Sequence, residues 1–394
     1  MAGKISNKIT KRFPWLLSPA APWILFGVAA LIATIHRLIL GPQSFNNYVI
    51  FERSFFHLLN NTNLYVAYPD EQYDLFKYSP TFAMLMAPLS LLPRVAGVMI
   101  WNLLNMLLPV WAISKMNIEQ KKKNLILLIL FIELLSSIQN AQSNGIMLGL
   151  IAGAFILFEQ KKNGAAMLLI AFGFHIKLFA AVAGLLLFFY PGKIKSIVYG
   201  IVYVSLLAVI PLLIVSPDQL ILQYKNWLEL LTHDPAHELN YSIMTLFERV
   251  AGIHIGDIYY LIPGAVLLML PLLRFKQYSS YGFRLLFTAS ILVWVVIFNH
   301  KAESPTYCIA FAGILLWYFT GDKSKAETTL MILAFIFVAL SPTDLFPRYV
   351  REHFVNPYSL KALFPVIIWL LITVQLSVRE HFYSPIEKLR MRTA

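Results

Sequence analysis

Charged residues and cysteine are both scarce in this sequence. Asp, Glu, Lys and Arg make up only 13% of its 394 residues, against 58% hydrophobic residues, and a water-soluble globule would need far more polar surface. The single cysteine, Cys308, excludes a disulfide framework and a cysteine-based metal site. No Walker loop, GxGxxG, HExxH or paired Cys/His spacing occurs, so nothing supports nucleotide hydrolysis or zinc chemistry.

Apolar runs fill most of the chain, and its mean hydropathy is +0.67. The runs do not alternate as barrel strands do, and a bilayer tolerates spanning backbone only in helices or closed barrels. We therefore predict an all-α polytopic membrane protein with about 11–13 transmembrane helices. Several runs are too short to cross about 30 Å of hydrocarbon at about 1.5 Å per residue, so we expect half-spans or tilted pieces among them. The runs cover residues 21–40, 79–93, 95–114, 124–139, 145–158, 164–176, 178–190, 196–215, 257–273, 282–298, 305–320, 327–341 and 361–378.

Basic residues predict the orientation of the chain. The net charge is +12, but Lys and Arg come in short clusters between apolar runs, as the positive-inside rule expects. We interpret this charge as topology and expect no nucleic-acid partner. The basic N-terminus and a first span without a cleavage site predict a cytoplasmic N-terminus in a plasma membrane, most simply a bacterial inner membrane. The clusters lie at residues 4–12, 121–123, 161–162, 193–195, 274–284, 323–325 and 379–392.

The segment 79–113 leaves the parity of the spans open. If every basic cluster is cytoplasmic, this segment makes one net crossing, and the run 79–93, with its three prolines, is re-entrant or tilted. Alternatively both runs cross, residues 121–123 lie outside, and 164–190 is one long span. We expect a single integral membrane domain over residues 1–394, without an internal repeat. Its outer loops under the first topology are 41–78, 216–256, 299–304 and 342–360.

Residues 46–61 of the first outer loop predict an amphipathic helix. At about 100° per residue, polar side chains including Asn46, Asn47 and His57 fall on one face, and aromatic and aliphatic side chains take the rest. This pattern is typical of a helix lying flat at a membrane surface. Glu52 falls on the apolar side. It sits at the wetter edge of the interface, pairs with a basic side chain, or has a raised pKa that suits proton transfer.

Polar residues in the outer loops and at the ends of apolar runs are the candidates for chemistry. Tyrosines and acids at 65–74, among them Asp70 and Asp74, suit either sugar binding or an interfacial aromatic belt. Lys177 between two apolar runs either snorkels or meets a phosphate. Gln142 and Asn144 form either a simple polar turn or part of a site. His300, within 299–304, belongs either to a solvated turn or to a site. Arg348 and Arg351 are either solvated or in contact with a lipid headgroup.

Several short motifs follow one another along residues 47–177. Asn47 and Tyr65 stand eighteen residues apart, and the first outer loop continues into Phe76-Lys-Tyr78-Ser-Pro80, then Met86-Ala-Pro88 and Leu92-Pro93. Further on come Gln142-Ser-Asn144, preceded by Ala141, and a glycine-led run from Gly164 that ends at Lys177. In order and spacing these motifs resemble glycosyltransferase family 87, which has an Asp at the position of Asn47, a Gly-Gln-x-Asn element with glycine at the position of Ala141, and a glycine-led run that ends in lysine.

This resemblance implies a GT-C-type membrane bundle with an outward-facing active site. It also implies a polyprenyl-phosphate sugar as donor, no nucleotide, and an acid in the first outer loop that deprotonates the acceptor. Asn47 departs from the pattern because an amide cannot act as a base. Either the base has moved, to Glu52, Asp70 or Asp74, or this chain is inactive, or it handles a different acceptor or reaction. We favour relocation, because the other elements keep their order.

We therefore predict an integral membrane hexosyltransferase that moves a sugar, mannose being one candidate, from polyprenyl phosphate to a lipid-linked or extracytoplasmic glycan acceptor. Its alternatives are a transporter or flippase for a lipid-linked glycan and an inactive scaffold of an envelope-assembly complex. We expect no cofactor and predict no metal site; the acids of the first outer loop could bind Mg²⁺ weakly, but no motif supports a divalent cation. The expected catalytic residues are Glu52, Asp74, Asn47 and His300, and the expected substrate-binding residues are Asp70, Tyr78, Gln142, Asn144, Lys177, Arg348 and Arg351.

Overall fold

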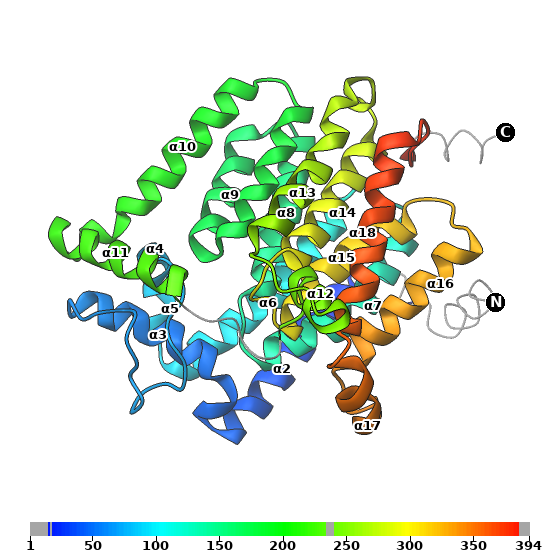
Figure 1. Cartoon of the computed structure of the whole chain (residues 1–394). Helices are drawn as coiled ribbons and strands as arrows, with labels where there is room; N and C mark the ends of the chain where they lie inside the picture. The colour runs from blue at the N-terminus through cyan, green and yellow to red at the C-terminus, as the bar shows by residue number, and fades with distance from the viewer. Residues whose placement is uncertain (1–14, 16–17, 234–239, 386–394) are drawn as a thin grey trace.

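The regular structure of the described chain is helical throughout (Figure 1). The computed structural model describes residue 15 and residues 18–233 and 240–385. Its α-helices are α2 (Ala21–Leu40), α3 (Asn46–Leu59), α4 (Pro80–Leu85), α5 (Ala87–Ser90), α6 (Arg94–Lys115), α7 (Gln120–Gln139), α8 (Asn144–Glu159), α9 (Asn163–Ile176), α10 (Lys193–Val209), α11 (Pro217–His233), α12 (Ile243–Ala251), α13 (Ile258–Met269), α14 (Tyr281–Ile297), α15 (Tyr307–Phe319), α16 (Lys325–Ala334), α17 (Arg348–Val350) and α18 (Leu360–Val378).

Shorter 3₁₀ and π segments extend or join these helices. The 3₁₀ segments are η2 (Pro42–Phe45), η3 (Leu178–Phe189), η4 (Ile210–Leu213), η5 (Leu270–Leu273), η6 (Phe275–Gln277) and η7 (Ser304–Thr306), and the π segments are η8 (Phe335–Leu340) and η9 (Arg351–Val355). The predicted all-α class is therefore confirmed for the described residues.

Four helices in the described residues are long and apolar enough to cross a membrane: Ala21–Leu40, Arg94–Lys115, Lys193–Leu213 and Leu360–Val378. Six shorter apolar helices accompany them, which agrees with the expected mixture of full spans and shorter pieces. The apolar run 79–93 forms only α4 and α5, and neither is long enough to cross by itself. The predicted total of 11–13 spans stays a prediction.

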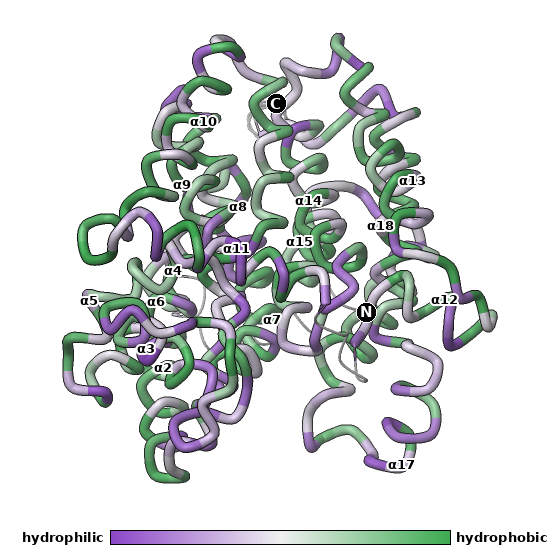
Figure 2. Tube along the Cα trace, turned by 60° about the vertical axis from the view of Figure 1, so that its left-hand side comes forward, coloured by the Kyte–Doolittle hydropathy of each residue, from purple (hydrophilic) through white to green (hydrophobic). Residues whose placement is uncertain are grey.

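Helices α14 and α15 form the centre of the bundle. Nearly every residue of both helices is buried, as expected of helices that are apolar on all sides and surrounded by other helices. Helix α14 packs on α15, α18 and η3, while α15 also packs on α7 and α8 (Figure 1). Figure 2 shows that the tube is mainly hydrophobic along the helices, and that hydrophilic residues concentrate in the connecting segments and near α17. This rigid centre supports both ends of the bundle.

Helix α8 packs tightly against α6 through three glycines. Gly145, Gly149 and Gly153 recur every four residues, so they share one helix face. A Cβ atom on Gly145 would overlap the backbone carbonyl of Asn105, and one on Gly149 would meet Leu108 at 2.5 Å. Small residues let membrane helices approach closely in this way. The close contact holds the N-terminus of α8, and the polar turn before it, against α6.

The helix predicted at residues 46–61 is present as α3, and it packs on α4 and α5. Phe51 anchors it through ring contacts with Tyr78 at 4.9 Å and Trp101 at 5.3 Å. The expected polar face is partly buried within the protein, because Ser54 is 1% exposed and His57 is 7% exposed. Position at a membrane surface stays a prediction for this helix.

Candidate active site

A cavity of about 540 Å³ opens between α3, the α9–η3 junction and the loop before α15. Its walls are of two kinds. One side is apolar and aromatic, with Phe179, Val182, Leu261, Trp294 and Phe298 among its residues. The other side carries amide, carboxylate and cationic side chains from four separate loops. A pocket that joins apolar walls to a few convergent polar groups is the usual form of a small-molecule site.

A continuous chain of hydrogen bonds crosses the polar wall. Lys177 Nζ donates to Asn144 Oδ1 at 2.6 Å, Asn144 Nδ2 donates to Gln142 Oε1 at 2.5 Å, and Gln142 Nε2 donates to Glu303 Oε2 at 2.6 Å. This series of hydrogen bonds therefore has a cation at one end and a carboxylate at the other. Both amides have a defined orientation, since each donates through nitrogen and accepts through oxygen. This arrangement fixes Lys177 and Glu303 in the same wall of the cavity.

Lys177 reaches the cavity because the helix breaks at this residue. Helix α9 ends at Ile176, η3 begins at Leu178, and the backbone of Lys177 is extended at φ −142° and ψ 119°. The break lets an apolar segment turn while a single cation projects from the turn. Lysine at such a place is costly unless it meets polar or anionic partners, and Asn144 supplies one in this structure.

The turn that carries Gln142 is held from below by α3 and α6. Ala141 has a φ of +49°, a left-handed conformation that costs a non-glycine residue about 1–2 kcal/mol. Trp101 Nε1 donates to the carbonyl of Ala141 at 2.9 Å, and Asn47 Nδ2 donates to the carbonyl of Asn140 at 2.8 Å. These bonds offset the strain and explain how alanine is tolerated where the resembled motif has glycine.

Seven of the eleven predicted site residues meet at this cavity. Asn144 lies behind the wall in the hydrogen-bond chain. His300 is half-exposed, with Nδ1 at 3.5 Å from Asp257 Oδ2. The six that line the cavity directly are Asn47, Asp74, Tyr78, Gln142, Lys177 and His300.

Four predicted residues lie away from the cavity. The Glu52 carboxylate accepts from Arg94 Nε at 2.6 Å, and its side chain is 8% exposed, which matches the alternative of pairing with a basic side chain. Arg348 pairs with Glu352 at 2.6 Å at the surface, and Arg351 donates to the Thr343 carbonyl at 3.3 Å. Asp70 is exposed. The predicted roles of Glu52, Asp70, Arg348 and Arg351 stay predictions, without a place in the cavity wall.

Glu303 is a site residue that the sequence does not predict. The loop 299–304 is predicted to contribute His300, and spacing gives no sign that Gln142 and Glu303 meet across 161 positions. A buried ion pair positions this loop from behind: Lys361 Nζ lies 3.3 Å from Glu133 Oε1 and donates to Ser304 Oγ at 2.9 Å. The residue after Glu303 is therefore tied to α7 and α18.

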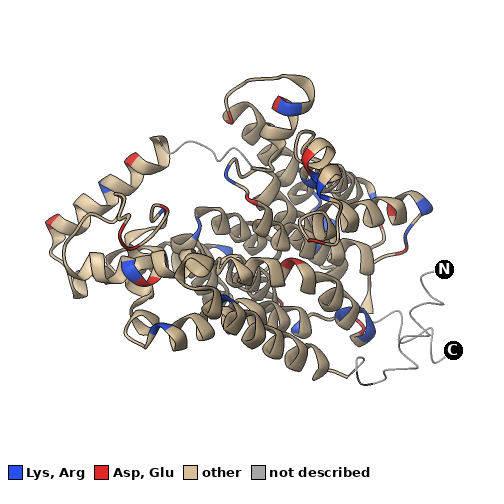
Figure 3. Cartoon of the chain, turned by 90° about the horizontal axis from the view of Figure 1, so that it is seen from below, with Lys and Arg blue, Asp and Glu red and all other residues tan. Residues whose placement is uncertain are grey.

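The electrostatics of the cavity favour an anionic ligand near its polar wall. Lys77, Lys177 and Lys301 line it, against the carboxylates of Asp74 and Glu303. Elsewhere charged residues lie mainly at helix ends and in loops, as Figure 3 shows. Burial raises the pKa of Tyr78 well above its ordinary value, so its phenol stays a neutral hydrogen-bond donor at physiological pH.

Metal-binding side chains do not gather in the part of the chain that the structure describes. No group of three His, Cys, Asp or Glu residues comes together there in an arrangement that would hold an ion. The carboxylates of the cavity, Asp74 and Glu303, each have lysines nearby on the cavity wall.

Comparison with known proteins bears on the identity of the chain. No curated protein matches its sequence. The model of glycosyltransferase family 87 matches residues 76–299, which is more than half of the 394 residues. The matched stretch contains Tyr78, Gln142, Asn144 and Lys177, whereas Asn47, Asp74 and Glu303 lie outside it. The chain belongs to glycosyltransferase family 87, a family of membrane glycosyltransferases.

Proposed function

We propose that this cavity transfers a hexose, with mannose as the first candidate, from a polyprenyl-phosphate donor to a lipid-linked or extracytoplasmic glycan acceptor. The observation that carries the proposal is the hydrogen-bond chain from Lys177 to Glu303, which holds a cation and a carboxylate beside an apolar wall. A lipid-phosphate sugar has the matching parts: an apolar chain, an anionic phosphate and a hydroxyl-rich ring. In this proposal the bundle is of GT-C type and lies in a plasma membrane. Its N-terminus is in the cytoplasm, and the cavity opens on the outer side.

Lys177 holds the leaving phosphate in this mechanism. The acceptor oxygen attacks the anomeric carbon while the bond from that carbon to the phosphate oxygen breaks. The electron pair leaves with the phosphate, whose charge grows from one to two negative charges. A fixed cation in a partly dry pocket stabilises such growing charge strongly. No cofactor takes part.

Asp74 is the base that we propose for the acceptor hydroxyl. Its Oδ1 accepts from the Leu75 amide at 2.7 Å and lies 3.5 Å from Lys77 Nζ, while Oδ2 makes no hydrogen bond within the described residues. That oxygen remains available to take the acceptor proton. Glu303, by contrast, is engaged by Gln142 at 2.6 Å, so we propose that it orients the amides and balances the charge of Lys177.

Transfer of radiolabelled sugar from synthetic polyprenyl-phosphate donors, mannose first, tests this function. Membranes would carry the wild type, Asp74→Asn, Glu303→Gln and Glu52→Gln. We expect wild-type transfer, loss of at least about 10²-fold in Asp74→Asn as for a general base, and near-normal transfer per folded protein in Glu52→Gln. Loss in Glu52→Gln alone would restore the predicted role of that residue. Wild-type protein that transfers no sugar from any polyprenyl-phosphate donor would refute the proposal.

A further inference from the structure

A second cavity, of about 460 Å³, lies at the opposite end of the bundle. Helix α7 runs from Gln120, beside this cavity, to Gln139, beside the candidate active site, and its 20 residues span about 30 Å. Helices α14 and α15 likewise have one end at each cavity. The second cavity is therefore on the side where the basic clusters 121–123 and 323–325 and the described residue Arg379 lie.

Cations outnumber acids on the lining of this second cavity. Lys122, Lys323 and Arg379 line it, and Asp322 is the acidic residue among the lining positions. Aromatic rings complete the wall. Phe382 packs edge-on against Phe283 at 5.2 Å, and a Cβ atom on Gly282 would overlap the backbone of Tyr383. The segment 381–384 is thus held as a built wall of the cavity.

Lys323 lacks a hydrogen-bond acceptor although its side chain is 7% exposed. Its Nζ lies 4.1 Å from the centre of the Trp317 ring, and the nearest carboxylate oxygen, Oε1 of Glu327, is 3.9 Å away. No acceptor in the described part of the chain comes within hydrogen-bond distance of this ammonium. Burial lowers the pKa of Lys323 from 10.5 to about 8, which expresses the cost of holding its charge there.

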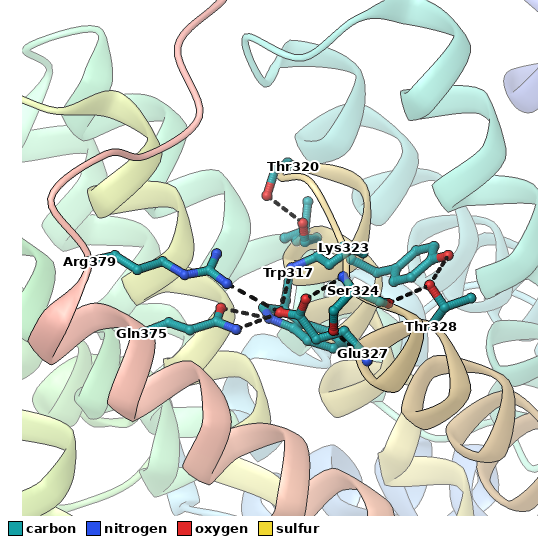
Figure 4. A network of polar contacts seen from close by, with 10 residues as sticks. Trp317, Thr320, Lys323, Ser324, Glu327, Thr328, Gln375 and Arg379 are labelled. Carbon is teal, nitrogen blue, oxygen red and sulfur yellow. Dashed lines mark hydrogen bonds and ion pairs between the residues drawn. The ribbon is translucent and has the colours of Figure 1, made fainter.

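Glu327 does not satisfy Lys323, because other donors already occupy it (Figure 4). The backbone amide of Ser324 donates to Glu327 Oε2 at 2.8 Å, Gln375 Nε2 donates to Oε1 at 2.7 Å, and Arg379 Nη2 lies 3.3 Å from Oε1. Gln375 is fixed in turn, since its Oε1 accepts from Trp317 Nε1 at 3.0 Å. These hydrogen bonds hold Glu327 and Gln375 in place. The Lys323 ammonium beside them has three N–H donors that can bind a ligand.

We propose that this cavity binds a phosphate-type anion, supplied by the headgroup of an anionic phospholipid. Lys323 and Arg379 would contact the phosphate oxygens, and Trp317 and Tyr383 would pack on the glycerol and upper acyl carbons. Basic pockets between membrane helices on the cytoplasmic side bind anionic headgroups in this way, and Trp and Tyr favour the depth of the headgroups. The inference is independent of the glycosyltransferase proposal, because the two cavities share no lining residue.

Native mass spectrometry of the purified full-length protein tests the proposal. The protein in mild detergent would be titrated with phosphatidylglycerol, with phosphatidylcholine and with inorganic phosphate, and the affinity of each adduct measured. The variants are Lys323→Gln and Arg379→Gln, with Lys325→Gln as the matched control, an exposed lysine two positions away that does not line the cavity. We expect phosphatidylglycerol to bind about 5- to 10-fold more weakly to each cavity variant and unchanged to Lys325→Gln.

Three other results of this titration would reassign the ligand or overturn the proposal. Binding of inorganic phosphate that weakens in the same two variants, without lipid binding, would support the anion site but assign it to a soluble phosphate. Equal binding of phosphatidylglycerol and phosphatidylcholine to the wild type would overturn the proposal. Equal loss in Lys325→Gln would also overturn it, because the effect would then be that of net charge. A circular dichroism melt checks that Lys323→Gln and Arg379→Gln are folded. The test can be carried out with one of the two variants if the other does not fold.

Discussion

Replacing Lys177 by glutamine tests the proposed mechanism most directly. Glutamine keeps a donor for Asn144 but removes the positive charge from the cavity wall. Removing one group that stabilises a developing anion costs about 2.7–4 kcal/mol, or about 10²–10³ in rate. Lys177 is half-buried and its cavity opens to solvent, and solvent screening reduces the effect of a charge. We therefore expect the lower end, a fall of about 10²-fold in kcat.

Lys177→Gln should change KM less than kcat. The donor already carries one negative charge on its phosphate when it binds, so Lys177 contributes to binding. The second charge develops only as the bond to the sugar breaks, so the larger part of the interaction appears in the transition state. Loss of transition-state stabilisation lowers kcat, whereas loss of uniform binding raises KM alone.

The assay is steady-state transfer from polyprenyl-phosphate mannose by purified protein, with kcat and KM measured separately. Lys225→Gln is the matched control, because Lys225 is an exposed lysine on α11 that does not line the cavity. A melt in the same detergent checks that Lys177→Gln is folded. A folded Lys177→Gln protein with kcat within about threefold of the wild type would refute the role assigned to this residue.

Three further predictions concern stability. Lys361→Met should lower the free energy of unfolding by about 3–5 kcal/mol, because it leaves Glu133 buried without its partner; chemical denaturation should show part of this loss restored when Glu133→Gln is added. Gly145→Ala should lower the free energy of unfolding by about 1–3 kcal/mol, because the added methyl overlaps α6. Gly27→Ala is the control: nothing lies within 4 Å of its added methyl, so the melting temperature should stay unchanged or rise. Equal melting temperatures for the two variants would contradict this packing. Burial lowers the pKa of His57 below 6.5, so as the pH drops the unfolded chain binds a proton at this imidazole before the folded chain does. The free energy of unfolding should therefore fall as the pH drops through 6.5 towards the lowered pKa. His57→Gln should flatten this part of the plot of unfolding free energy against pH, and an unchanged plot would contradict the prediction.

The class of the protein and the position of most helices could be predicted from the sequence alone. Its apolar runs correspond closely to helices in the structure, because backbone in a bilayer must be satisfied in helices or closed barrels and these runs do not alternate as barrel strands do. The run at 21–40 coincides with α2, and the break at Lys177 follows from a lone cation between two apolar runs. The family was also recognisable, because Gln142, Asn144 and Lys177 keep their order and local spacing.

Which polar residues meet depends on the packing of the helices and could not be predicted from the sequence. Hydrophobic periodicity reports the face of one helix, but it carries no information about pairing between distant segments. Glu52 on the apolar face of its helix suggested either catalysis or an ion pair, and the approach of Arg94 from α6 gave the ion pair. Glu303 joined Gln142 for the converse reason: the packing of α7 and α15 brings two loops together that lie far apart in the chain. The candidate site is therefore a product of helix packing, which acts through contacts that no local pattern encodes.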